Sequence, residues 1–396
     1  MADKNEHATV FDYLTWRGDL TFAQDGFNEV DNLILCIISY INFKKISRLW
    51  STDPADAMTM GEVCAFLTSE DEQLGLSEED YIPLMRAAAK TKRFGGVKLF
   101  AYESSHDDVR EMQFNAVTFL LPDESIFVAF MGTDRSFAGW KEDFNMSFLE
   151  AVPAQMRAIA YTTEIARACP DRTLRIGGHS KGGNLAIYSA VKCAQAVQQR
   201  IVGVYNNDGP GFLNDLSATV EHQRIAERIH TVVPQSSVVG MLLEHEKNVQ
   251  VVHSTYEGIM QHDGFSWEVK GTQFVHLDDF SREGKLFDET IDAWADALSP
   301  QQREGFSDAL YEVLTATGAR TLSELGGEKL KSAVSILKSY KSLDRETRDA
   351  LSDSFKLLLH MGAKSVLESA QGEQEREMEQ LRAALRQQKK KLPEKR

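Results

Sequence analysis

The residues best suited to chemistry lie in the run G-G-H-S-K-G-G-N, which contains the pattern G-x-S-x-G at Gly178, Ser180 and Gly182. A strand-like segment, 172–176, precedes this run and a helix-like segment, 185–191, follows it. Strand, tight turn and helix in this order are the context of a nucleophile elbow. The turn strains the backbone of the serine, and glycines flank it because a Cβ there would clash. The pattern therefore predicts that Ser180 exposes its Oγ at the positive end of a helix, where backbone N–H groups can hold an oxyanion.

A serine hydroxyl is a weak nucleophile, so it needs a base within hydrogen-bond reach and an acid that orients the base. In hydrolases that use such an elbow, the acid and then the histidine follow the serine in the chain. Of the downstream histidines, His262 stands in a loop between expected strands, late in the domain. Helix-like or strand-like runs contain or adjoin His222, His230, His253 and His276. We expect His262 to be the catalytic base. The alternative is a histidine that satisfies loop backbone groups.

The acid has two interpretations, which both stay open. Asp208 directly follows an expected strand, 201–205, and would there face the mouth of the sheet. The same residues, Asn-Asp-Gly-Pro-Gly, are typical of a turn in which aspartate bonds its own backbone. Asp263 is the weaker choice, because neighbouring loop side chains such as those of His262 and Asp263 usually diverge.

A second segment is expected to complete the site. The apolar strand 127–131 ends in Gly132-Thr133. A small hydroxyl residue at such a strand end can offer its N–H and its Oγ to an oxyanion. The alternative for Thr133 is the cap of a helix that follows. The aromatic segment 136–152 fits either a lid or amphipathic packing.

These motifs together carry a resemblance. The combination F-x-G-T-x-x-S…W…D with a later G-H-S-x-G-G resembles the class 3 (fungal-type) lipases. More closely, the chain resembles a family of bacterial lipase-like proteins of the α/β-hydrolase superfamily. Its members similarly combine W-R-G-D-L-T-F, here Trp16 to Phe22, with G-H-S-K-G-G-N and with N-D-G-P-G-F, here Asn207 to Phe212. The resemblance covers residues 10–290.

The resemblance implies that Ser180 is the nucleophile, that Thr133 is an oxyanion residue and that the backbone N–H of Lys181 is the second oxyanion donor. The chain departs from the lipase pattern at two places. Those lipases mostly carry leucine where Lys181 stands, and the lysine suggests a polar or anionic group near the site. They also carry the acid in an Asp-x-Val-Pro segment, whereas the matching stretch 233–239 has no carboxylate. Either Asp208 supplies the acid from the preceding strand, or the triad is incomplete.

Strands that alternate with helices predict an α/β protein with a mostly parallel central sheet flanked by helices. With the resemblance, this becomes an α/β-hydrolase fold. We expect an N-terminal, mainly helical segment over 1–95, the hydrolase core over 96–298, and a helical C-terminal extension over 299–396 with a charged tail. The expected helices are 28–43, 77–95 (with a capping pair Ser77/Asp80), 155–169 and 216–229, and the expected strands are 97–103, 114–121, 125–131, 201–205, 230–233 and 249–253, with a hairpin over 266–277.

Composition narrows the class of protein. The chain has 396 residues with a net charge of −15, which argues against nucleic acid and against an anionic membrane surface as partners. There is no signal-peptide pattern and no apolar run long enough to span a bilayer. The four cysteines are scattered, so we expect buried free thiols and a cytoplasmic protein. No cofactor is expected: the glycine run lacks the lysine placement of a P-loop, and the His/Asp clusters at 105–108 and 276–279 lack the partners of a metal site.

The leading hypothesis is a serine hydrolase that cleaves carboxylic esters, lipase- or esterase-like, through an acyl-enzyme on Ser180. Its partner would be a small-molecule ester or lipid-like substrate. The missing secretion signal and Lys181 argue against a digestive lipase. Two alternatives remain: a non-catalytic or acyl-transferring relative that binds a ligand in the same pocket, and a scaffold protein that self-associates through its C-terminal helices.

Overall fold

The computed structural model describes residues 7–67, 81–107, 110–133, 137–243 and 248–315, with six single positions (345, 348, 349, 352, 353 and 356). The expected capping pair Ser77/Asp80 and most of the expected C-terminal extension lie outside the described residues. Within them, no helix is both long enough and apolar enough to cross a membrane.

A nine-stranded sheet runs through the molecule in the order β1-β2-β3-β4-β5-β6-β7-β8-β11, and β9 and β10 form a separate hairpin. The strands are β1 (Met58–Thr59), β2 (Lys98–Asp107), β3 (Met112–Leu120), β4 (Ile126–Phe130), β5 (Leu174–His179), β6 (Ile201–Asn207), β7 (Ile229–Pro234), β8 (Val249–Val252), β9 (Val269–Lys270), β10 (Gln273–Phe274) and β11 (His276–Leu277). The strands β4 to β8 pair in parallel, whereas β1 to β4 and β11 pair antiparallel. The sheet is therefore mixed, not mostly parallel as expected.

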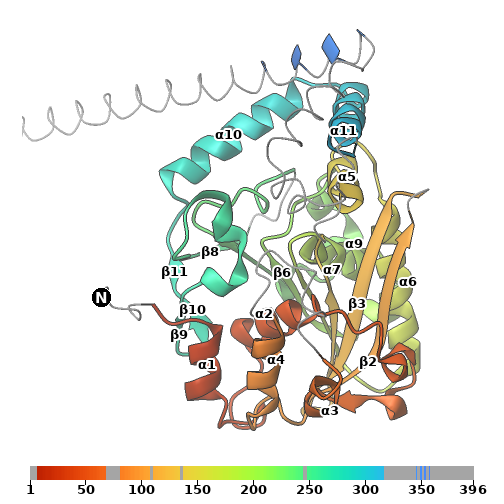
Figure 1. The fold of residues 1–396 in the computed structure, drawn as a ribbon, viewed down its shortest axis with the longest axis vertical. Helices are drawn as coiled ribbons and strands as arrows, with labels where there is room; N and C mark the ends of the chain where they lie inside the picture. The colour runs from red at the N-terminus through yellow and green to blue at the C-terminus, as the bar shows by residue number, and fades with distance from the viewer. Residues whose placement is uncertain are drawn as a thin grey trace, which may run out of the picture.

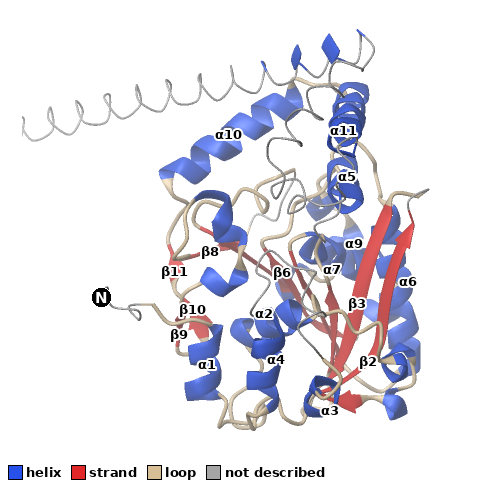
Figure 2. Ribbon diagram, viewed as in Figure 1, coloured by secondary structure: helices blue, strands red, loops and turns tan. Residues whose placement is uncertain are grey.

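Helices cover both faces of this sheet (Figures 1 and 2). They are α1 (Val10–Arg17), α2 (Glu29–Ile38), α3 (Met60–Cys64), α4 (Tyr81–Ala89), α5 (Phe137–Asn145), α6 (Pro153–Ala168), α7 (Lys181–Lys192), α8 (Gln195–Gln198), α9 (Val220–Gln223), α10 (Arg282–Asp296) and α11 (Pro300–Thr315). In Figure 1, α1, α2 and α4 lie together in red and orange, and α10 and α11 lie at the top. The Lys141 ammonium of α5, 3.1 Å from the Asp308 carboxylate, links α5 to α11.

Strand β4 shows why helices are needed on both faces. Successive side chains of a strand point to opposite faces, and all of β4 is buried. Phe127 and Ala129 enter the apolar cluster that contains α2 and α4. Ile126, Val128 and Phe130 enter the cluster on the other face, which contains α6 and α7. An unbroken apolar strand of this kind is stable only when both faces are covered.

The N-terminal segment is joined to residues far along the chain. The Val269 N–H donates to the Ala8 carbonyl at 2.8 Å. The Trp16 indole N–H donates to the Gly271 carbonyl at 3.0 Å, across 255 residues. The Phe11 ring stacks on Phe265. These contacts place the start of the described chain against the segment that follows the loop of His262.

The expected elements mostly form, and one does not. The expected helix 216–229 is wrong: the segment holds only α9 between two short 3-10 turns, 216–218 and 226–228. The Asp215 carboxylate caps the first turn and the Thr219 hydroxyl caps α9. Each side chain bonds the backbone and begins a new short helical turn, so no continuous helix forms. Elsewhere α2 ends at Ile38, short of the expected 43, and α4 ends at Ala89, before the glycines at 95 and 96. All four cysteines are free; Cys36, Cys169 and Cys193 are buried as expected, whereas Cys64 is half-buried.

Candidate active site

Ser180 occupies the turn between β5 and α7. Its backbone has φ 59° and ψ −137°, a region that L-residues rarely adopt and that marks local strain. The Ser180 N–H donates to the Asn207 carbonyl of β6 at 3.0 Å, which fixes the turn to the neighbouring strand. A Cβ on Gly178 would lie 2.1 Å from the carbonyl carbon of Gly182, so the turn requires glycine at this position. The structure thus has the strand–turn–helix arrangement that the sequence predicted.

The end of β4 lies beside this turn. A Cβ on Gly132 would stand 2.8 Å from the Cβ of Ser180 and 2.1 Å from the Tyr40 hydroxyl. Thr133, the next residue, donates its hydroxyl to the Asp143 carboxylate of α5 at 2.5 Å. Helix α5 begins only at Phe137, so Thr133 is not its cap residue. The structure therefore brings the Gly-Thr segment to the serine, as expected from the sequence.

Asp208 and His262 are in direct contact. The Oδ2 atom of Asp208 lies 2.6 Å from Nδ1 of His262, and the Asp208 side chain is fully buried. Its Oδ1 atom accepts hydrogen bonds from the Ser237 hydroxyl and from the Gly240 N–H (3.2 Å). The carboxylate thus bonds residues of other segments, although the Asp208 backbone has a φ of 53°, as expected of a turn. Asp263, the weaker choice, instead accepts from the Phe265 N–H.

The stretch after β7, where the lipase pattern carries its acid, holds Ser237. This residue is buried and donates its hydroxyl to Asp208. The ends of two neighbouring strands therefore form this contact together. The residue after β6 supplies the carboxylate, and the turn after β7 supplies the donors that bind it.

His179, which sequence reasoning overlooked, lies under the loop of His262. The two rings are tilted by 32° to each other with centroids 4.6 Å apart, and the His179 Nε2 lies 2.7 Å from the His262 carbonyl oxygen. A carbonyl can only accept, so Nε2 carries the proton and Nδ1 accepts from the Tyr40 hydroxyl at 3.0 Å. Burial, and then the nearby His262, lowers the pKa of His179 to about 3, so the ring is neutral. The signal in the sequence was the histidine directly before the serine.

The side chain of Lys181 is directed into the protein. Its side chain is buried, and Nζ donates to the Glu142 carboxylate (2.9 Å) and to the side-chain and backbone oxygens of Gln113 (2.6 and 3.0 Å). Glu142 also accepts from the N–H groups of Gln113 and Ala154. The sequence suggested a polar or anionic group near Lys181, and the ammonium is bound to the Glu142 carboxylate of α5 and to Gln113 of β3. Its backbone N–H belongs to the first residue of α7, directly after Ser180.

Two atoms are left available for chemistry. Among the described residues, neither the Ser180 Oγ nor the His262 Nε2 has a hydrogen-bond partner. Ser180 is half-buried and His262 is 7% exposed. Catalytic hydrogen bonds are often long in unliganded enzymes and shorten in the substrate complex. A hollow of about 250 Å³ elsewhere, along β2 and Tyr161, has none of these residues in its lining.

The family model described as Mbeg1-like matches residues 88–312. The chain belongs to the Mbeg1-like family. This is a lipase-like family, so the resemblance seen in the sequence is confirmed at that level. The Mbeg1-like match includes Thr133, Ser180, Asp208 and His262, and leaves out Tyr40. A search among curated proteins found no match.

Solved structures similar to this Mbeg1-like chain are named lipases. The Rhizomucor miehei lipase propeptide complex, a Ser/Ile deletion mutant, is 13% identical, with 48% of this chain and 70% of that chain covered, at a TM-score of 0.34. Lip2 lipase from Yarrowia lipolytica is 11% identical, with 42% and 68% covered, at 0.31. The M37 lipase is 14% identical, with 53% and 68% covered, at 0.35.

Proposed function

We propose that this chain is a serine hydrolase of the α/β-hydrolase fold that cleaves carboxylic esters through an acyl-enzyme on Ser180. The contact that carries the proposal is the 2.6 Å hydrogen bond between the Asp208 carboxylate and His262 Nδ1. It leaves Nε2 as the basic atom of the histidine, on the side of the ring away from the carboxylate. A strained serine at a helix N-terminus, beside such a pair, is the arrangement that acyl transfer uses.

In this mechanism His262 Nε2 takes the proton of the Ser180 hydroxyl while Oγ attacks the ester carbonyl. Asp208 holds the Nδ1–H tautomer and stabilises the imidazolium that forms. Collapse of the tetrahedral intermediate expels the alcohol, which receives the proton from Nε2. Water, deprotonated by the same nitrogen, then releases the acid from Oγ.

The oxyanion donors that we assign are the backbone N–H groups of Lys181 and Thr133. The Thr133 hydroxyl proton is donated to Asp143, so the hydroxyl serves to fix the strand end. Each donor removed from such a site costs about 10²–10³ in turnover. The Lys181 side chain supports this geometry from behind, because its buried contact with Glu142 anchors the first turn of α7 to α5.

The same contacts bear on the segment 136–152. Glu142 is fully buried, and Asp143 is bonded to Thr133, so α5 is attached to the site by two neighbouring residues. We propose that α5 is a fixed wall of the site and not a lid. The division into 1–95, 96–298 and 299–396 stays part of the proposal.

An active-site-directed fluorophosphonate tests the proposed function. We expect the native chain to be labelled on Ser180 and to hydrolyse short p-nitrophenyl esters, and Ser180→Ala to do neither. Ser189→Ala is the matched control, since Ser189 is a buried serine on α7 that lies outside the site. No labelling of folded native protein, or labelling that survives in Ser180→Ala, would overturn the proposal.

A further inference from the structure

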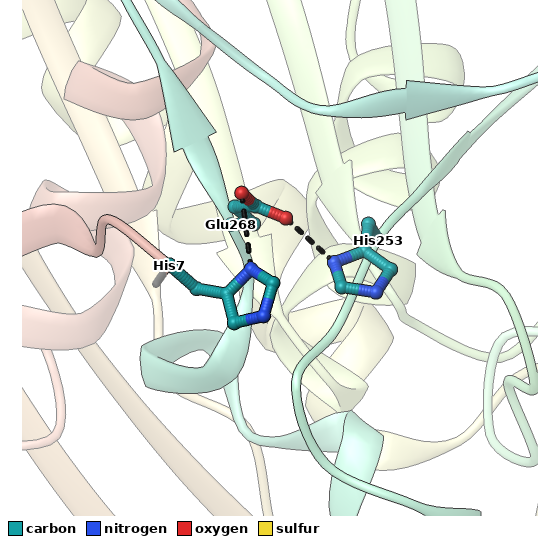
Figure 3. A group of neighbouring side chains, drawn as sticks. All are labelled: His7, His253 and Glu268. Carbon is teal, nitrogen blue, oxygen red and sulfur yellow. Dashed lines mark ion pairs between the residues drawn. The ribbon is translucent and has the colours of Figure 1, made fainter. Parts of the chain in front are cut away.

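Three metal-ligating side chains meet at a place that the proposed mechanism does not use. His7, His253 and Glu268 converge as Figure 3 shows, with the two imidazole rings on either side of the carboxylate. Glu268 Oε1 lies 3.2 Å from Nδ1 of His7, and Oε2 lies 2.7 Å from Nδ1 of His253. One ligand atom from each residue lies within 4.8 Å of the others.

The three residues lie at the neck of the loop that carries His262. The Glu268 N–H donates to the His253 carbonyl at 2.9 Å, and a bridge between residues 254 and 267 continues this pairing into the loop. His7 belongs to the N-terminal segment, which the bond from the Val269 N–H to the Ala8 carbonyl holds alongside. The cluster therefore joins three chain segments.

The ligand types suit a transition metal ion, and the contact between His253 and Glu268 is not a regular hydrogen bond. The His253 Nδ1 has no aligned hydrogen bond among the described residues, although Glu268 Oε2 lies 2.7 Å away. Two imidazoles and one carboxylate are the ligand set found around Zn²⁺, at distances of about 2.0–2.2 Å. Ligand atoms of a tetrahedral ion at such distances lie roughly 3.3 Å apart, close to the 3.2 Å between His7 and Glu268.

The exposure of the three side chains and the net charge of the chain also favour the binding of a cation. The side chains of His7, His253 and Glu268 are 46%, 31% and 21% exposed, so an ion can enter and keep water in its remaining positions. The net charge of −15 raises the local concentration of cations around the chain.

We propose that His7, His253 and Glu268 bind one Zn²⁺-type divalent ion that ties the N-terminal segment to the neck of the His262 loop. Imidazole ligands favour zinc and its neighbours, whereas Ca²⁺ and Mg²⁺ require oxygen. The ion would hold the loop in place and take no part in the chemistry. Only this last consequence rests on the proposed hydrolase function.

The test is calorimetric titration of the untagged full chain with Zn²⁺, and with Mg²⁺ as the comparison ion. We expect one equivalent of Zn²⁺ to bind at pH 7.5 and to bind weakly at pH 5, since protons compete for imidazole. His253→Ala and Glu268→Gln should each lower the affinity on the order of 100-fold. His276→Ala is the matched control, because His276 forms a similar pair with Glu29 (2.8 Å) and should leave Zn²⁺ affinity unchanged.

A second readout is the melting temperature. At a Zn²⁺ concentration 100 times Kd, binding to the folded state alone should raise Tm by about 3–6 °C in the native chain and not in His7→Ala. The proposal is overturned if no saturable Zn²⁺ binding occurs, if Mg²⁺ binds as well as Zn²⁺, or if the variants bind Zn²⁺ like the native chain. Neither readout uses ester hydrolysis, so failure of the metal site and failure of the hydrolase are distinguished.

Discussion

The contact between Lys181 and Glu142 and the contact between Asp208 and His262 are both buried, but they differ in how many of their polar atoms have a hydrogen-bond partner. In the contact between Lys181 and Glu142, the ammonium has three acceptors, and both carboxylate oxygens of Glu142 accept hydrogen bonds. In the contact between Asp208 and His262, the carboxylate is likewise held, but His262 Nε2 has no bond to a described residue.

This difference distinguishes a contact that only stabilises the fold from one that can take part in a reaction. A saturated ion pair fixes elements, and breaking it exposes a buried charge. In the second contact, only one ring nitrogen of the histidine is hydrogen-bonded. The ring is then held in a fixed orientation with its other nitrogen available, which is what a general base needs. From this comparison we propose that the Lys181 side chain is structural and that His262 is the general base.

The largest effect is expected at the unsaturated pair. Asp208→Asn keeps the shape of the side chain but favours the wrong tautomer of His262. The rate of fluorophosphonate labelling should fall about 10⁴-fold. The free energy of unfolding, measured with urea, should change far less, because an amide can still accept from Ser237 and Gly240. Equal losses of stability and of labelling would mean that the Asp208 contact is architectural, like that of Lys181.

The next effect concerns the neutral ring beneath His262. The pKa of His179 in the folded state, about 3, is below that of the unfolded chain, about 6.5. The stability gained from the neutral ring is therefore complete above pH 6.5 and is lost as pH falls toward 3. Between pH 6.5 and 3.5 this amounts to about 4 kcal/mol. His179→Gln should remove this part of the pH dependence in urea titrations. Parallel profiles for the native chain and the variant would contradict it.

Breaking the saturated pair should cost stability and spare activity. Lys181→Met leaves Glu142 as an unpaired buried charge, which should cost about 3 kcal/mol of unfolding free energy. The double variant Lys181→Met/Glu142→Leu should regain much of this loss. Labelling of the folded Lys181→Met chain should stay within about tenfold of native, since its backbone N–H remains. A 10³-fold loss of labelling would show that the ammonium acts in the reaction.

The smallest effect is expected from Tyr40, whose hydroxyl bonds His179 and also lies beside Gly132 at the end of β4. Tyr40→Phe leaves the buried Nδ1 of His179 without its donor and should cost about 1–2 kcal/mol of stability. The rate of fluorophosphonate labelling should fall by less than about tenfold when it is calculated for the folded fraction of the chain. If Tyr40→Phe were as inactive as Asp208→Asn, the phenol would have to take part in proton transfer.

Sequence patterns predicted the parts of the site that local periodicity encodes. The apolar runs of β4 and β5, the glycines around Ser180 and the loop position of His262 can all be seen within short windows. Asp208 was recognisable, but its two interpretations could not be separated, because Ser237 and Gly240 meet it from another strand. In the sequence after β7, the absence of a carboxylate was visible, but the donors to Asp208 were not.

The parts that were missed depend on register and long-range packing. The direction of the Lys181 side chain depends on where Glu142 falls on α5, which no pattern near residue 181 reveals. The helix expected over 216–229 satisfied apolar periodicity, but the capping side chains of Asp215 and Thr219 prevailed over it. The cluster of His7, His253 and Glu268 has no sequence signature at all, because its members come together only through the pairing of distant segments.

The bond between Trp16 and Gly271 has a consequence for the timing of synthesis. Its partners are 255 residues apart, so a growing chain carries its N-terminal segment without that partner while all the residues between are made. At about 5–20 residues per second, this interval is roughly 13–50 s. Contacts of such large sequence separation also form late in folding. The segment around Trp16 is thus translated well before the residue that its indole bonds in the folded chain.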